Sequence, residues 1–186
     1  MVGWIVWVTG PSGSGKSTIC QSLIRLMPRY GLKAQILSSD RLRKVITPKP
    51  VYSEKERRMF YAVLAFSACK LAEYGINVII DATGNRRAYR EAVQRLNSQF
   101  LEVYVDCPLE IRLKREATRK KRFGAPGSIY AKARIGLSKT VPGFGIPYEK
   151  PRNPSITVNS FEETPREGAE KILTVLLRKI DEWLRG

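Results

Sequence analysis

The chain has 186 residues, 43% of them hydrophobic, and its 33 Lys and Arg residues against 17 Asp and Glu residues give a formal net charge of +16. This length fits one domain with a sizeable core, and no apolar run approaches the ~20 residues of a membrane span. The charge fits three interpretations: binding to nucleic acid, attraction of polyanionic small substrates such as nucleotides, or a thermophile surface rich in Lys and Arg.

Short apolar runs alternate with helical segments along the chain. This alternation predicts an α/β fold, a five-stranded parallel sheet flanked by helices. Ser53, followed three residues later by Glu56, predicts the N-cap of a long helix, and Gly75 predicts its end. The predicted strands are Trp4–Val8, Ala34–Leu37, Ile76–Ile80, Phe100–Val105 and Ser155–Val158, and the predicted helices are Gly15 to about Pro28, Ser53–Tyr74, Arg86 to about Ser98, Leu109 to about Thr118 and Thr164–Trp183.

The stretch between the first strand and the first helix fits the pattern G-x-x-x-x-G-K-[ST] at every fixed position. Its glycines permit backbone torsions that let successive N–H groups hold phosphate oxygens, and the following helix adds its positive end. We expect Lys16 to reach the β- and γ-phosphates and the Ser17 hydroxyl to hold Mg²⁺. The sequence therefore predicts an ATP and Mg²⁺ site that consists of Gly10, Pro11, Ser12, Gly13, Ser14, Gly15, Lys16, Ser17 and Thr18.

Acidic residues follow three of the predicted strands, at the sheet edge where ligands bind in such folds. Because the chain has no histidine, any proton transfer must use a carboxylate, a lysine, a tyrosine or water. Asp40 is a candidate acceptor of a hydroxyl proton, with Arg43 on the same face if a helix starts there; the alternative is a helix N-cap at Asp40 with a solvated arginine. Asp81 is either a Mg²⁺ anchor or an ordinary strand-end cap, and we expect Asp106 to be structural.

Arginines cluster elsewhere in the chain, and as a group they predict recognition of phosphate or sulfate oxygens. Phosphoryl transfer is mainly positioning and charge neutralisation, so its site needs several cations. The clusters are Arg57 with Arg58, Arg86 and Arg87 with Arg90, and Arg115 with Arg119.

One long stretch, residues 119–154, breaks the alternation of strands and helices. It is rich in Gly, Pro, Lys and Arg and contains a helical patch at Ile129–Gly136. Long irregular stretches inside a compact domain are usually functional or disordered, so we interpret it as a lid, with a floppy insertion as the alternative. We expect one domain over residues 1–186, with the lid at about 119–154.

Three cysteines, Cys20, Cys69 and Cys107, lie far apart in the sequence. They have neither the spacing of a zinc site nor that of a redox pair, which predicts reduced, mostly buried thiols and a cytoplasmic protein. Because Met1 leads directly into the first predicted strand, we expect no signal or transit peptide.

Several segments together resemble the adenylylsulfate kinases, a family of P-loop kinases that transfer the γ-phosphate of ATP to the 3′-hydroxyl of adenylyl sulfate. These segments are Gly10–Ile19, Leu101–Glu110 with the following Arg115, Ile129–Arg134 and Pro147–Pro154. The resemblance implies catalytic roles for Lys16 and Asp40 and a metal site at Ser17 and Asp81. It also implies that Gly10–Thr18 and Arg115 bind ATP, and that the acceptor is bound by Asp40, Arg43, Arg87, Lys132 and one of the pair Arg57 and Arg58.

The chain departs from the family pattern on the acceptor side. The family motif DGDxxR reads Ser38-Ser39-Asp40-Arg41-Leu42-Arg43, Gly84 stands at a family serine, and Val141-Pro142-Gly143 replaces FTG, although Phe144 is close by. The segment Ile79–Thr83 instead resembles a stretch of polynucleotide and related small-substrate P-loop kinases. With the positive charge, it keeps a 5′-hydroxyl polynucleotide or other small-molecule kinase as the alternative, with nucleic acid as partner; a nucleotide-gated binding protein and a homodimer also stay open.

Overall fold

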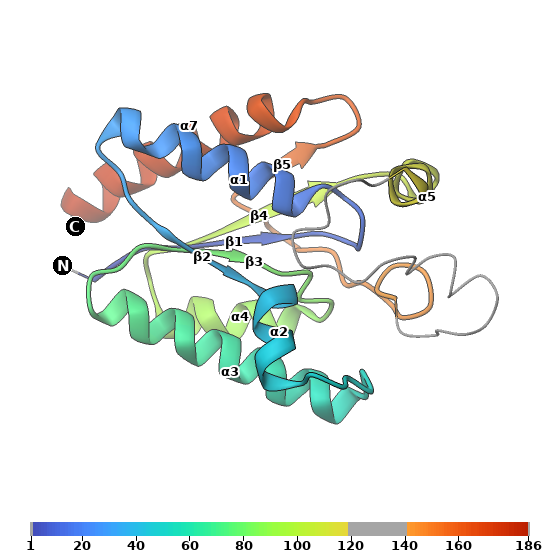
Figure 1. Cartoon of the computed structure of the whole chain (residues 1–186). Helices are drawn as coiled ribbons and strands as arrows, with labels where there is room; N and C mark the ends of the chain where they lie inside the picture. The colour runs from blue at the N-terminus through green and yellow to red at the C-terminus, as the bar shows by residue number, and fades with distance from the viewer. Residues whose placement is uncertain (1, 119–140, 186) are drawn as a thin grey trace.

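The computed structural model describes residues 2–118 and 141–185, and it contains one parallel five-stranded sheet (Figure 1). The strands follow the order β2-β3-β1-β4-β5 across the sheet, and every neighbouring pair is parallel. The predicted α/β class is therefore confirmed. The strand bounds are β1 Ile5–Thr9, β2 Gln35–Ser38, β3 Val78–Asp81, β4 Phe100–Asp106 and β5 Ile156–Asn159.

Within the described residues, each predicted helix is present, with ends shifted by a few residues, and a further short helix follows β2. The predicted N-cap of the long helix is confirmed, because the Ser53 hydroxyl accepts a hydrogen bond from the Glu56 amide at 3.1 Å. Gly75 follows that helix with a φ of 76°, as a C-terminal glycine does. The bounds are α1 Lys16–Leu26, the 3₁₀ helix η1 Met27–Tyr30, α2 Ser39–Ile46, α3 Glu54–Glu73, α4 Arg87–Leu96, α5 Leu109–Ala117 and α7 Pro165–Arg185.

Two hydrophobic cores lie on opposite faces of the sheet, because side chains alternate along each strand. Val6 and Val8 of β1 pack with α1 and α7, whereas Ile5 and Trp7 pack with α3 and α4. Figure 1 shows these helix pairs as layers above and below the sheet. All five residues of β1 are buried, so β1 is the centre of the fold, and its carboxyl end is a rigid base for the segment that follows.

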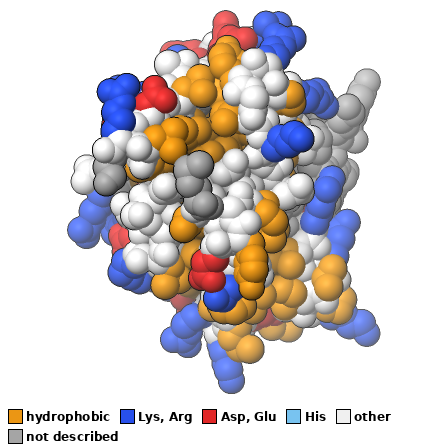
Figure 2. Space-filling model, turned by 90° about the vertical axis from the view of Figure 1, so that its left-hand side faces the viewer, with side chains coloured by type: hydrophobic (Ala, Val, Ile, Leu, Met, Phe, Trp, Pro, Cys, Tyr) orange, Lys and Arg blue, Asp and Glu red, His pale blue; other side chains and the backbone are white. Residues whose placement is uncertain are grey.

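The carboxyl ends of the strands point to the right in Figure 1, and both termini lie at the opposite edge. Figure 2 shows that opposite edge: hydrophobic side chains form patches on it, and Lys and Arg side chains stand around its margin without forming one continuous patch. On this face, the net charge is therefore not concentrated as a nucleic-acid footprint requires. Among the described residues, no helix is long and apolar enough to cross a membrane.

Candidate active site

The glycine-rich stretch after β1 forms a tight loop with three positions that require glycine. Gly10, Gly13 and Gly15 have φ angles of 154°, 79° and 96°. A Cβ atom on Gly10 would lie 2.5 Å from the carbonyl oxygen of Val105, a distance that real Cβ atoms do not tolerate. The loop leads directly into α1, with Gly15 as its N-cap. The helix amides and the positive end of its dipole therefore face the same space as the loop amides, which is the arrangement that binds phosphate.

Lys16 lies over this loop rather than in solvent. Its side chain is 8% exposed, and its Nζ donates hydrogen bonds to the carbonyl oxygens of Gly10 and Pro11, both at 3.0 Å. The ammonium group is thus fixed beside the amides that would hold phosphate oxygens. A cation held there complements the anionic end of a nucleoside triphosphate.

Two oxygen donors suited to Mg²⁺ meet beside the loop. The Ser17 side chain hydrogen-bonds to the Asp81 carboxylate at the end of β3. Burial raises the pKa of Asp81, whereas the positive charge of Lys16 and the bond from Ser17 act in the opposite direction. Mg²⁺ takes hard oxygen ligands and usually binds through one or two protein groups, waters and substrate phosphates. The donors at residues 17 and 81 fit that requirement. Among the described residues, no group of three or more His, Cys, Asp or Glu could form a complete cage.

Asp40 lies in the first turn of α2, at the end of β2 next to β3. The N-cap of α2 is Ser38, so the alternative assignment of Asp40 as the N-cap is wrong. The negative charge of Asp40 contributes to the raised pKa of Asp81, which places the two carboxylates in one electrostatic environment. Arg43, three residues on, is only 11% exposed and is therefore not the solvated arginine of that alternative.

Arg43, Arg57 and Asp40 all act electrostatically on the Tyr52 hydroxyl, so the three charges lie in one part of the site. The Nη1 of Arg43 donates to Glu56 Oε1 at 2.8 Å, and its guanidinium carbon lies 3.9 Å from the centre of the Phe60 ring. Arg57 is 4% exposed, and its Nε donates to the carbonyl oxygen of Tyr52 at 3.1 Å. Burial lowers the pKa of Arg57, and the nearby charge of Arg43 lowers it further. Glu56 neutralises one of these two cations, so the pair still carries a positive charge that favours a further anionic partner.

Arg58 differs from its neighbour because its side chain is exposed on α3. Arg58 and Arg57 are adjacent on one helix and point about 100° apart. The structure thus brings Arg57 into the group around Asp40 and leaves Arg58 at the surface.

Two arginines of α5 lie against the phosphate loop, one of them predicted. Arg115 donates through Nη1 to the Ser160 hydroxyl at 3.1 Å, and its Nη1 lies 3.6 Å from the position of a Cβ on Gly15. Sequence reasoning missed Arg112, which donates to the carbonyl oxygens of Ser12 at 3.5 Å and Gly143 at 3.4 Å. The sequence did indicate Arg112, because it lies three residues before the predicted Arg115 and residues three apart share a helix face.

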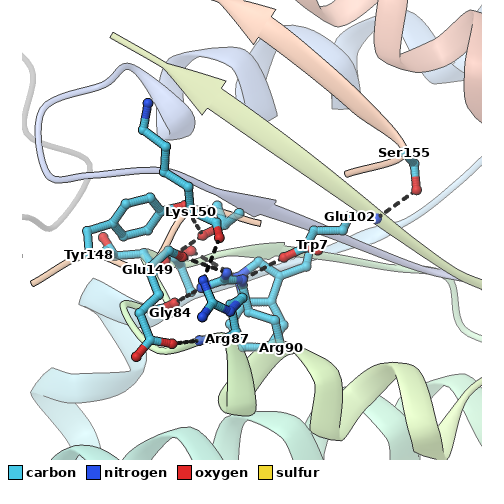
Figure 3. A network of polar contacts seen from close by, with 12 residues as sticks. Trp7, Gly84, Arg87, Arg90, Glu102, Tyr148, Glu149, Lys150 and Ser155 are labelled. Carbon is cyan, nitrogen blue, oxygen red and sulfur yellow. Dashed lines mark hydrogen bonds and ion pairs between the residues drawn. The ribbon is translucent and has the colours of Figure 1, made fainter. Parts of the chain in front are cut away.

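Residues 147–150, here called the returning segment, lie against the end of β1 and the start of α4, and Figure 3 labels Tyr148, Glu149 and Lys150. The Tyr148 hydroxyl lies 2.9 Å from the Thr9 hydroxyl at the end of β1. Arg87, at the start of α4, donates its backbone N–H to Glu149 Oε2 at 2.8 Å and its Nη1 to the Lys150 carbonyl oxygen at 3.2 Å. Arg87 is therefore tied to the returning segment by both main chain and side chain.

The remaining predicted residues divide between structural roles and the part of the chain that is not described. Asp106 accepts hydrogen bonds from the Tyr104 hydroxyl at 2.8 Å and from the Cys107 amide at 3.0 Å, which agrees with a structural role. The cysteines are free and buried, as predicted. Lys132 and the helical patch at 129–136 lie outside the described residues, as does the 119–140 part of the expected lid.

Comparisons with known proteins agree with this geometry. The sequence model of the adenylylsulphate kinase family matches residues 2–159. An adenylyl-sulfate kinase of Clostridium kluyveri is 35% identical over 182 residues, 97% of this chain and 86% of that protein, and one of Synechococcus is 30% identical over 174 residues, 94% of each.

Solved structures give the same result. The Mycobacterium tuberculosis APS kinase CysC, in complex with AMPPNP and APS, superposes with a TM-score of 0.82 at 28% identity, covering 94% of this chain and 98% of that one. A gluconokinase of Sinorhizobium meliloti superposes with a TM-score of 0.66 at 18% identity, and the match covers 99% of this chain and 97% of that one. At this identity, the likeness shows the fold alone. From the family match over residues 2–159 and relatives that align along most of their length, the chain belongs to the adenylylsulphate kinase family.

Proposed function

We propose that this chain transfers the γ-phosphoryl group of ATP to the 3′-hydroxyl of adenylyl sulfate and forms 3′-phosphoadenylyl sulfate. The observation that carries the proposal is the meeting of two half-sites at one sheet edge in a chain of this family. One half is the phosphate loop with Lys16 and the Ser17–Asp81 pair, and the other is Asp40 with two arginines.

The ATP half is formed by Gly10–Thr18 and by Arg115, which lies against Gly15. Lys16 neutralises charge that develops between the β- and γ-phosphates, and its ammonium already lies at the loop, where it donates to the Gly10 and Pro11 carbonyl oxygens. Ser17 and Asp81 hold Mg²⁺, which neutralises phosphate charge when bound.

The acceptor half is formed by α2 and by the start of α3. Asp40 orients the 3′-hydroxyl and accepts its proton, a role that falls to a carboxylate in a chain without histidine. The guanidinium groups of Arg43 and Arg57 bind the anionic phosphosulfate, since planar guanidinium groups match its oxygens. Arg87 binds the acceptor from the start of α4. Of the predicted pair, Arg57 takes this role and Arg58 remains a surface residue.

We assign the protein to the cytoplasm and treat residues 1–186 as one domain. Three free, buried cysteines support a reducing compartment. The proposal includes acceptor binding by Lys132, a role that rests on the resemblance of the lid sequence to the family.

The test measures ADP release with adenylyl sulfate, with an RNA oligonucleotide carrying a 5′-hydroxyl, and with no acceptor. We expect ADP and 3′-phosphoadenylyl sulfate in equal amounts in the first reaction only. Lys16→Ala is expected to remove this turnover. Transfer to the oligonucleotide instead would support the polynucleotide kinase alternative. Slow hydrolysis that is independent of any acceptor would support a nucleotide-gated binding protein.

A further inference from the structure

The loop between β3 and α4, residues 82–86, is held rigidly although it has no regular structure. It begins directly after Asp81, the carboxylate paired with Ser17. Side chains from β1 and α3 engage its backbone one residue after another: Trp7 Nε1 donates to the Ala82 carbonyl at 2.9 Å, the Thr9 hydroxyl donates to the Thr83 carbonyl at 2.6 Å, and the Tyr61 hydroxyl accepts from the Gly84 amide at 3.0 Å. The backbone of this loop is therefore fixed from the core side.

Arg90 of α4 completes this arrangement by binding three separate segments at once (Figure 3). Its side chain is 1% exposed. Its Nε donates to Glu102 Oε1 of β4 at 2.5 Å, its Nη1 donates to the Gly84 carbonyl oxygen, and its Nη2 donates to the Glu149 carbonyl oxygen at 2.8 Å. A single guanidinium thus joins β4, the β3–α4 loop and the returning segment.

The same two segments determine the position of Arg87. The Glu149 amide donates to the Asn85 carbonyl oxygen at 2.8 Å, and the Glu149 carboxylate accepts from the Arg87 amide. The Arg87 guanidinium donates to the Lys150 carbonyl oxygen. A displacement of the returning segment would therefore move Arg87, which the proposed function assigns to acceptor binding.

A buried ion pair such as Arg90–Glu102 is weak evidence for stability, because the cost of removing both charges from water offsets their attraction. The planar guanidinium of Arg90 contributes something else, namely three donors in fixed directions. A lysine would keep the charge but could not satisfy Glu102, Gly84 and Glu149 together. The chemistry of Arg90 is therefore that of a group that fixes the relative positions of its partners.

We propose that Arg90, oriented by Glu102, is a positioning residue for the acceptor side of the site. It acts through the Gly84 and Glu149 carbonyl oxygens and so holds Arg87 where the anionic acceptor binds. The inference rests on the proposed function. It predicts a selective effect, because the three hydrogen bonds of Arg90 go to Glu102, Gly84 and Glu149, which are not residues of the phosphate loop.

The experiment measures KM for adenylyl sulfate, KM for ATP, kcat and the unfolding temperature for Arg90→Lys and Glu102→Gln. We expect KM for adenylyl sulfate to rise at least about tenfold, equivalent to about 1.4 kcal/mol, and KM for ATP to stay within about twofold. The matched control is Arg166→Lys, which alters an exposed ion pair with Glu170 on α7 and should change neither KM.

If the Arg90 and Glu102 variants unfold, Glu149→Gln tests the same network at a more exposed residue. Its carboxylate is 32% exposed, so this variant should fold, and it weakens the bond to the Arg87 amide. We expect the same selective rise in KM for adenylyl sulfate without a change in unfolding temperature.

Equal rises in both KM values, or no change in KM for adenylyl sulfate in the folded variants, would overturn the positioning role. Absence of turnover with adenylyl sulfate in the unmodified protein would instead overturn the proposed function, and this inference with it.

Discussion

Gly84→Ala tests how tightly the β3–α4 loop is packed. Gly84 has a φ of 49°, and a Cβ there would lie 2.8 Å from Trp7 Cζ2 and 3.1 Å from Arg90 Cγ. The left-handed torsion costs a non-glycine residue about 1–2 kcal/mol, and overpacking costs about 1–3 kcal/mol. Trp7 is fully buried, so its ring cannot move away. We expect a total of about 2–5 kcal/mol, which lowers the unfolding temperature by about 4–20 °C in a domain of this size.

The assay is thermal unfolding followed by circular dichroism, with Gly31→Ala as the matched control. Gly31 also has a left-handed torsion, with a φ of 69°, but nothing lies within 4 Å of the position of its Cβ. The control therefore carries the torsional cost without the clash. Equal unfolding temperatures for the two variants would refute the reasoning, because the contact with Trp7 and Arg90 would then contribute nothing.

The remaining predictions concern the site residues. Asp40→Asn should retain ATP affinity, measured by calorimetry, and lose phosphoryl transfer; nearly unchanged transfer would exclude Asp40 as the base. Arg57→Ala should raise KM for adenylyl sulfate by about tenfold or more, the loss expected for a charged hydrogen bond, whereas the exposed Arg58→Ala should leave it unchanged. Burial raises the pKa of Tyr148 from 10.0 to about 12, so its proton stabilises the folded state fully below pH 10, and this contribution is lost as the pH rises toward 12. The unfolding temperature should therefore fall more steeply over that range in the unmodified protein than in Tyr148→Phe, and parallel curves would contradict this assignment.

The sequence predicted those parts of the molecule that depend on local patterns. Apolar runs marked the strands, the spacing of Ser53 and Glu56 marked the start of α3, and the glycine pattern marked the phosphate loop. The resemblance to the adenylylsulfate kinases, based on distant segments, is confirmed by the family match. The roles of individual site residues stay predictions.

Features that depend on tertiary contacts were harder to predict. Helix α2 has only eight residues and none of them is buried, so its three apolar residues, Leu42, Val45 and Ile46, form too short a pattern to predict a helix. The choice between Arg57 and Arg58 also depended on tertiary contacts. Arg57 lies three and seven residues before the buried Phe60 and Leu64, and Arg58 lies at the same spacing before the buried Tyr61 and Ala65, so helix spacing does not separate them. The three partners of Arg90 lie on segments far apart in the sequence, and only the folded chain brings them together.

Arg112 links two regions that have so far been described separately. Its guanidinium donates to the carbonyl oxygen of Ser12 in the nucleotide loop and to that of Gly143 in the turn closed by Val141 and Ile146. A nucleotide that orders the loop should therefore stabilise the turn. Because thermodynamic coupling is reciprocal, ordering of the turn should increase nucleotide affinity by the same free energy. Hydrogen exchange at the amides of residues 143–146 should therefore slow when AMPPNP is added. The first of these residues follows Ser12 by 131 positions in the sequence.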